Sequence, residues 1–247
     1  MQAGTVSKPI RPLAALKALR ALLRNGEDTR QVFLIIDALR GRSGERAFER
    51  FRKTEIGRTV LSERRVLLDR LSDRAALARL PEGSLGRAYL AFMAAQNLTA
   101  EGLVEASETG DRQALSEERR LFGARSRDTH DLQHVVTGYG RDGLGEVSLL
   151  AFGYAKTKNR GIGLIALAGM FKVARHLPGL PVKRAVWEAY RHGRRAAWML
   201  HQDWEALLAE PLEQVRRNLN ILPPTRYQSI IAAVAASRAP ETAMAAE

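Results

Sequence analysis

The chain has 247 residues, of which 45% are hydrophobic and 27% are charged, and it can bury a full core as one large domain or two small ones. It contains no cysteine, so disulfides, thiolate metal sites and cysteine nucleophiles are excluded. The net charge of +12 favours anionic partners. Because no nucleic-acid recognition motif is present and basic residues alternate with acidic ones, we expect no nucleic acid and favour anionic lipid headgroups.

Apolar residues recur at three- and four-residue spacing along most of the chain, which predicts helices. The first helix should end at Asn25-Gly26, and Asp28 or Thr29 can cap the second. Ser84 can cap another after the break at Pro81. Pro178 and Pro181 separate the last two predicted helices. The predicted helices cover residues 11–24, 31–40, 44–53, 57–80, 84–97, 100–108, 113–126, 146–157, 161–176 and 181–208.

The pattern predicts a single all-α domain. Period-two alternation, the sign of strands, is absent, and no linker divides the chain. The last ten residues, RAPETAMAAE, read as disordered, so we place the domain at residues 1–240 and a disordered tail at 241–247. The longest apolar run, residues 161–171, is about half of the ~20 residues that span a bilayer, so no transmembrane helix is predicted. The start of the chain has no signal-peptide core, so we do not expect secretion.

Two histidines four residues apart, His130 and His134 in HDLQH, are the strongest chemical signal. On a helix they share a face, with Asp131 in about the same quadrant, so both rings can converge on one ion. A further ligand must come from elsewhere. The glycine-rich segment TGYGRDGLG can reverse the chain and bring Glu146, at the start of the next helix, back toward the histidines. Two imidazoles with one or two carboxylates suit Zn(II), Fe(II) or Mn(II).

Other readings of this constellation stay open at this stage. In one, Asp131 caps a helix and the histidines are half exposed, without a metal. A metal-dependent phosphohydrolase is a weaker reading, because such enzymes need an upstream histidine and none precedes residue 130. The metal site is favoured over the first of these readings by charged neighbours that could orient the ligands through hydrogen bonds: Arg127, Asp128, Arg141 and Asp142.

HDLQH, eleven residues and a glutamate match the HDxxH-x11-E signature, and the chain resembles the Coq-four family of ubiquinone (coenzyme Q) biosynthesis proteins. The resemblance extends over roughly residues 28–222. It includes LPEGSLGRAYLAFM before the signature and TGYGRDGLGEVSLLAF, YAKTKNRGI and VWEAYRHGRRA after it. One departure is Asn220, where the family has glycine. The resemblance implies that His130, Asp131, His134 and Glu146 bind a divalent metal, usually taken as zinc, with Fe(II) as the alternative.

The resemblance also implies an all-helical protein, peripheral on a membrane, that replaces the C1 carboxylate of a polyprenylated benzoate head group with hydroxyl. This is an oxidative, metal-dependent decarboxylation. The same four residues would be catalytic. The family's other implied role is a non-catalytic scaffold that binds prenyl lipid and gathers the other ubiquinone enzymes. We further expect a homo-oligomer on the cytoplasmic face of the bacterial inner membrane, or on the mitochondrial inner membrane in a eukaryote.

The two helices after the signature, VSLLAFGYA and GIGLIALAGMF, are rich in glycine and alanine. A polyprenyl tail needs an apolar groove or tunnel, and small residues let a flexible chain approach the backbone. We therefore expect residues 147–176 to line a groove that opens near the metal ligands. The alternative is that they form the buried core, and both can hold at once.

Overall fold

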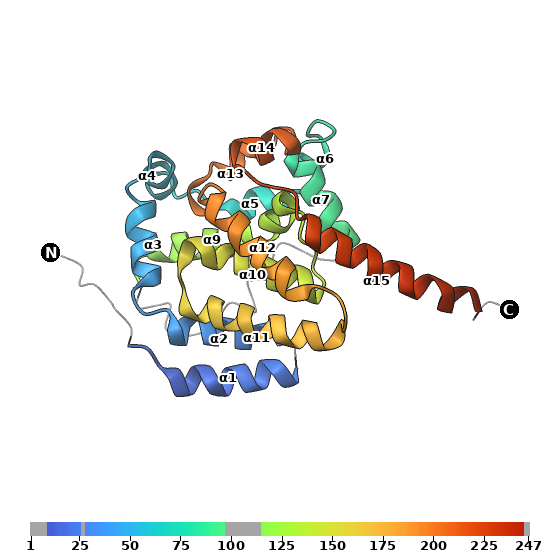
Figure 1. Cartoon of the computed structure of the whole chain (residues 1–247). Coiled ribbons are helices and arrows are strands. Elements are labelled where there is room, and N and C mark those ends of the chain that lie inside the picture. The colour runs from blue at the N-terminus through green and yellow to red at the C-terminus, as the bar shows by residue number, and fades with distance from the viewer. Residues whose placement is uncertain (1–8, 26–27, 97–114, 245–247) are drawn as a thin grey trace.

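The computed structural model describes residues 9–25, 28–96 and 115–244. Within these ranges the chain is a single all-α domain without strands, as predicted (Figure 1). The helices are α1 (Pro12–Arg24), α2 (Thr29–Leu39), α3 (Ser43–Phe51), α4 (Glu55–Ser62), α5 (Leu67–Ser72), α6 (Arg74–Ala78), α7 (Leu85–Ala95), α9 (Glu117–Thr137), α10 (Gly143–Thr157), α11 (Arg160–His176), α12 (Val182–Arg195), the 3-10 helix η2 (Met199–His201), α13 (Trp204–Leu207), α14 (Leu212–Asn218) and α15 (Thr225–Met244).

The centre of the domain is α10, which packs against α11 and α12, while α11 also contacts α2 and α2 contacts α1. The main apolar core lies around α10 and α12 and includes Leu132, Phe152, Ala189 and Trp204. Gly193 of α12 has no room for a side chain, because an added Cβ would overlap the carbonyl of Phe152 in α10. The two central helices therefore meet backbone to backbone at this point. In the described part of the chain, no helix combines the length and apolarity needed to cross a bilayer.

Several predicted boundaries need correction. The helix predicted at 57–80 is three helices, because the chain turns at Arg64, which has a positive φ of 55°, and Asp73 starts α6 by accepting a hydrogen bond from the amide of Ala76. Asp28 lies at the start of α2, but its carboxylate accepts a hydrogen bond from the side-chain amide of Gln31 and none from a backbone amide of the helix. The helix predicted at 100–108 lies outside the described residues.

The helix predicted to run from 181 to 208 ends at Arg195. Its last carbonyl accepts a hydrogen bond from the Asn220 side chain, and the amide of Ala197 donates to the carbonyl of Leu219. Tertiary contacts therefore replace the next helical turn. Asn220 has a φ of 52°, the left-handed region that glycine adopts freely and asparagine tolerates.

Two helices near the end of the chain, α14 and α15, were not predicted. In α15 the helix continues to Met244 and so includes residues 241–244 of the segment expected to be disordered. Alanine, glutamate and methionine in that segment are strong helix formers, which the composition argument overlooked. Figure 1 shows α15 extending away from the rest of the domain.

We expect Gly193→Ala to lower the free energy of unfolding by about 1–3 kcal/mol, because the new methyl group overlaps a backbone carbonyl that cannot move aside. Urea denaturation measures this. Gly153→Ala is the matched control: it lies on α10 with open space around the added atom, and it should stabilise the protein by about 0.5–1 kcal/mol. Equal stabilities for the two variants would contradict the close contact between α10 and α12.

Candidate metal centre

Both histidines of the signature lie on α9, one unbroken helix of 21 residues. The side chain of Ser116 accepts a hydrogen bond from the amide of Arg119 at its start, and Gly138, with a φ of 75°, ends it. Arg216 of α14 donates to the carbonyls of Val135 and Val136, each at 2.9 Å. These two carbonyls are in the last turn, where no helical amide remains to bind them. The end of α9 beside the site is thereby fixed by a distant helix.

His134 is completely buried and held in one orientation. Its Nδ1 is 2.9 Å from the carbonyl oxygen of Tyr139, which can only accept, so this nitrogen carries the proton. The ring also stacks on Phe92, with 5.7 Å between centroids. The Nε2 of the neutral ring therefore presents a lone pair to the site. Metal-binding histidines in proteins share this arrangement, with the second ring nitrogen donating to a carbonyl or carboxylate.

The reversal between α9 and α10 places Glu146. Asp142 accepts hydrogen bonds from the amides of Leu144 and Gly145, both at 3.0 Å, and so begins α10. Gly145 packs on the carbonyl of Gly140 so closely that a side chain would overlap it. Tyr227 of α15 donates to the other carboxylate oxygen of Asp142 and accepts from the amide of Gly140. Glu146 then lies in the first turn of α10, facing α9.

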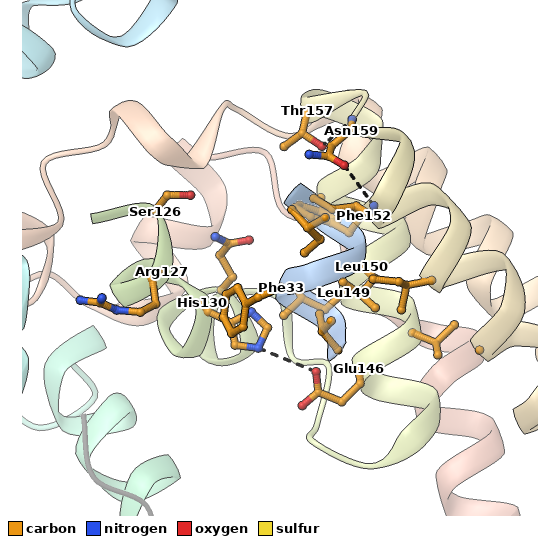
Figure 2. Close-up of a pocket in the computed structure, with 18 of the residues that line it drawn as sticks. Phe33, Ser126, Arg127, His130, Glu146, Leu149, Leu150, Phe152, Thr157 and Asn159 are labelled. Carbon is orange, nitrogen blue, oxygen red and sulfur yellow. Dashed lines mark hydrogen bonds and ion pairs between the residues drawn. The ribbon is translucent and has the colours of Figure 1, made fainter. Parts of the chain in front are cut away.

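His130, His134 and Glu146 converge as the sequence predicted. The two Nε2 atoms are 3.2 Å apart, and the carboxylate oxygens of Glu146 lie 3.5 Å from His134 Nε2 and 3.8 Å from His130 Nε2. Figure 2 shows the side chains of His130 and Glu146 pointing toward each other. Burial lowers the pKa of His130, and the neighbouring His134 lowers it further. Burial raises the pKa of Glu146, but the close contact with His134 and the nearby charges outweigh it, so its net pKa is lowered. A neutral histidine and an ionised carboxylate are the forms that bind a metal.

Asp131 is not part of this group of three. It lies in the middle of α9, so it does not cap a helix, and the complete burial of His134 also contradicts the reading with half-exposed histidines. The Oδ1 atom of Asp131 is buried without a hydrogen-bond partner among the described residues. Its role as a metal ligand stays a prediction.

The flanking charged residues differ in their contacts. Arg127 pairs with Asp128 at 2.7 Å, away from the three converging side chains, and burial raises the pKa of Asp128 against the opposing effect of Arg127. Asp142 caps α10. Arg141 is the one of these four flanking residues that contacts the converging side chains in the described part of the chain. Its Nε is 3.5 Å from the carboxylate of Glu146.

These donor atoms fit a divalent ion. The three ligand atoms lie within 4.8 Å of one another, and two imidazoles with one carboxylate are a common set for Zn(II) or Fe(II) at catalytic sites. Glu146 and His130 each retain about a third of their side-chain exposure, 33% and 31%, so the side of the site away from His134 remains accessible. A metal held here would keep a coordination position for a substrate oxygen.

A cavity of about 1540 Å³ begins at His130 and Glu146, larger than the roughly 300–1,000 Å³ of typical ligand pockets. Its described lining comes from α1, α2, α3, α9, α10, α11 and α15 and from residues near η2. The expectation that residues 147–176 line a groove near the ligands is confirmed: α10 and α11 contribute Val147, Leu149, Leu150, Phe152, Ile162, Ile165, Ala168 and Gly169. Figure 2 shows Leu149 and Leu150 between Glu146 and Asn159.

Sequence reasoning missed the residues that hold the site from a distance, above all Arg216, Tyr227 and the carbonyl of Tyr139. Arg216 and Tyr227 are separated from their partners by 80 or more positions, and no local pattern pairs them. For Tyr139 the residue spacing offered a signal, since it follows His134 by five positions within the predicted chain reversal.

Comparison with known proteins agrees with this geometry. The family described as coenzyme Q (ubiquinone) biosynthesis protein Coq4 matches residues 12–225. The mitochondrial ubiquinone biosynthesis protein COQ4 homologue of Rattus norvegicus is 32% identical over 184 residues, 72% of this chain and 66% of the relative. The Bos taurus homologue is 30% identical over 177 residues, 71% and 64% of the two chains. The match thus spans just under two thirds of these relatives.

A solved structure has a similar fold. It is a candidate ubiquinone biosynthesis protein from Nostoc punctiforme, with a TM-score of 0.63 and 23% sequence identity, and the alignment covers 85% of this chain and 98% of the other. At this identity the likeness supports the fold alone.

We expect the purified protein to bind about one Zn²⁺ per chain, and His134→Ala to weaken binding by roughly a hundredfold or more. Changes to the outer partners of such histidines already cost roughly 10- to 100-fold. Equilibrium dialysis with metal analysis measures this. His176→Ala is the control, because His176 lines the same cavity but is exposed and bonded to the carbonyl of Lys172. Unchanged metal content in His134→Ala would contradict the site.

Proposed function

The chain belongs to the coenzyme Q (ubiquinone) biosynthesis protein Coq4 family, and we propose that it acts on a polyprenylated benzoate intermediate whose head group meets the His130–His134–Glu146 site. The observation that carries the proposal is the continuity of that site with a large cavity lined by apolar residues of α10 and α11. A prenylated aromatic has a polar reacting group at one end and a long apolar tail. The head group would lie at the metal-binding side chains and the tail along the apolar residues of α10 and α11. Together these two surfaces favour a prenylated aromatic over a small polar substrate.

The reaction we propose is oxidative decarboxylation at C1 of the head group. The bond from the ring to the carboxylate breaks and a bond from the ring to a hydroxyl oxygen forms. With dioxygen as oxidant and a two-electron donor as co-reductant, one carboxylic acid, one O₂, two electrons and two protons give one phenol, one CO₂ and one water. A bound divalent ion would supply Lewis-acid stabilisation of oxygen anions at the ring.

The residues of this chain have separate tasks in that reaction. His134 is fixed by Tyr139 and Phe92 and cannot turn away from the site. Glu146 is kept ionised by its neighbours. The apolar side chains around Leu149 and Phe152 exclude water from the ring, which strengthens the electrostatic interactions of the head group with the site.

A second role remains in the proposal: a scaffold that binds prenyl lipid and gathers other ubiquinone enzymes or copies of itself. The same cavity would bind the lipid in both roles, and the roles differ in whether the bound lipid is converted to product. Carboxyl-labelled 3-farnesyl-4-hydroxybenzoate, Zn²⁺ or Fe²⁺, a reductant and oxygen should release labelled CO₂ with the wild-type protein. His134→Ala should release it only at the background rate, and His176→Ala at the wild-type rate. Tight binding of the lipid without CO₂ release under either metal would favour the scaffold.

A lipid substrate requires access to a membrane, and one face of the domain suits an anionic bilayer. The segment between Glu146 and Asp203, which supplies this face and part of the cavity lining, has ten lysines and arginines and a single acidic residue, Glu188. Three large apolar side chains are exposed there: Trp187 at 61%, Leu167 at 52% and Phe171 at 45%. Lys183 lies over the ring of Phe171, and Trp187 stacks on Tyr190. We call these five residues the aromatic–basic face.

This composition is typical of proteins at a bilayer interface, where aromatic rings enter the headgroup layer and lysines pair with anionic lipid. The opposite side of α11 lines the cavity through Ala168 and Gly169. A bilayer on the aromatic–basic face would thus be separated from the cavity by one helix. We place the protein peripherally on such a membrane; the mammalian relatives are named mitochondrial, and a bacterial protein would use the cytoplasmic face of the inner membrane.

We expect the protein to co-sediment with vesicles containing anionic lipid at 0.1 M salt and to bind weakly at 1 M, because the Debye length falls from about 10 Å to about 3 Å. Trp187→Ser and Lys183→Glu should each weaken binding. Val66→Ser removes an exposed apolar side chain outside this face and should have no effect. Equal binding by all three variants would contradict the assignment of this face.

A further inference from the structure

Besides the apolar residues, seven lysines and arginines are among the described residues that line the cavity, and six of them contact groups of the protein away from the metal-binding side chains. Arg119 forms two hydrogen bonds with Glu45, and Arg127 pairs with Asp128. The other engaged cations bind one carboxylate or backbone carbonyl each: Arg40 with Asp37, Arg120 with Leu115, Lys156 with Arg194 and Lys172 with Leu23. None of these partners belongs to the converging group of His130, His134 and Glu146.

Arg141 is different. In the described part of the chain, its Nε pairs with the carboxylate of Glu146 at 3.5 Å. Glu146 is itself one of the three side chains that could hold a metal. A guanidinium has five N–H donors, four of them on the two terminal nitrogens. Those four have no protein partner among the described residues. The side chain is 31% exposed and lines the cavity at the end where His130 and Glu146 lie.

The backbone around Arg141 is held on both sides. The preceding Gly140 donates its amide to Tyr227, and the following Asp142 is fixed by α10 and by the same tyrosine. The start of the side chain is therefore fixed relative to Glu146, and the guanidinium can meet a ligand without reordering the loop. Such preorganisation is what a recognition residue requires.

We propose that the terminal nitrogens of Arg141 bind the carboxylate of the cavity's aromatic ligand beside the metal position. The inference rests on the proposed function and adds to it a carboxylate subsite. The planar fork of an arginine matches a carboxylate in two parallel hydrogen bonds, which a lysine cannot reproduce. Because the product of decarboxylation has no carboxylate, Arg141 holds the substrate and not the product. It is a specificity residue that also favours product release.

The test compares two probes in detergent micelles without oxygen, so that no turnover occurs: 3-farnesyl-4-hydroxybenzoate and 2-farnesylphenol, which lacks the carboxylate. Binding is measured to the zinc-loaded wild-type protein and to Arg141→Gln, Arg141→Lys and Arg120→Gln. The last variant is the matched control, because Arg120 lines the same cavity, is exposed and donates to the Leu115 carbonyl. Zinc content is measured for every protein.

We expect the wild-type protein and Arg120→Gln to prefer the carboxylate probe by roughly 10- to 100-fold, as for a charged hydrogen-bonded pair. Arg141→Gln should lose this preference while its zinc content and its affinity for 2-farnesylphenol are unchanged. Arg141→Lys should keep part of the preference, because it retains the charge without the fork.

Two results overturn the subsite alone, with the proposed function intact. One is a preference that persists in Arg141→Gln. The other is a loss of zinc in that variant, which would show that Arg141 acts by orienting Glu146. A wild-type protein that binds neither probe would instead overturn the proposed function, and the subsite with it.

Discussion

The hydrogen bonds of the Asp142 carboxylate hold the chain reversal on which the rest of the site depends. One oxygen begins α10 and the other binds Tyr227, so a single side chain joins the loop, the central helix and the last helix. If α10 began one residue later, Glu146 would rotate by about 100° around the helix axis and leave the histidines. Gly145 makes the reversal sterically possible, since any side chain there would overlap the backbone of Gly140.

The helix that carries the histidines is polar and yet largely buried. Arg125, with 1% of its side chain exposed, forms two hydrogen bonds with Glu205 at 2.6 and 2.7 Å. Burial raises the pKa of Glu205, and Arg125 more than reverses the effect, so the pair stays ionised. Buried ion pairs are weak sources of stability, because desolvation offsets most of the attraction, but breaking one is costly. These contacts fix the orientation of α9 more than they stabilise the fold.

Helix α11 separates two very different environments. One side, with Ile165 and Gly169, lines the cavity, and the other carries Leu167 and Phe171 on the aromatic–basic face. This explains why its sequence reads as apolar around much of its circumference. A helix that lines an apolar groove and a helix of the buried core have the same composition, so the pattern GIGLIALAGMF was compatible with both readings.

The sequence by itself determined the helical class and the convergence of His130, His134 and Glu146. Those features depend on contacts within a turn of helix and on a glycine-rich reversal of few residues, which leave a local pattern. The end of α12 at Arg195, the clamp of Arg216 on α9 and the link from Tyr227 to Asp142 were decided only in the tertiary structure. Each joins segments 25 or more positions apart, where the pairing depends on how helices pack and not on neighbouring residues. The same reason applies to Arg119, Lys156 and Lys172 in the cavity, whose partners are 38 or more positions away, so the contacts of these cations could not be paired from the sequence.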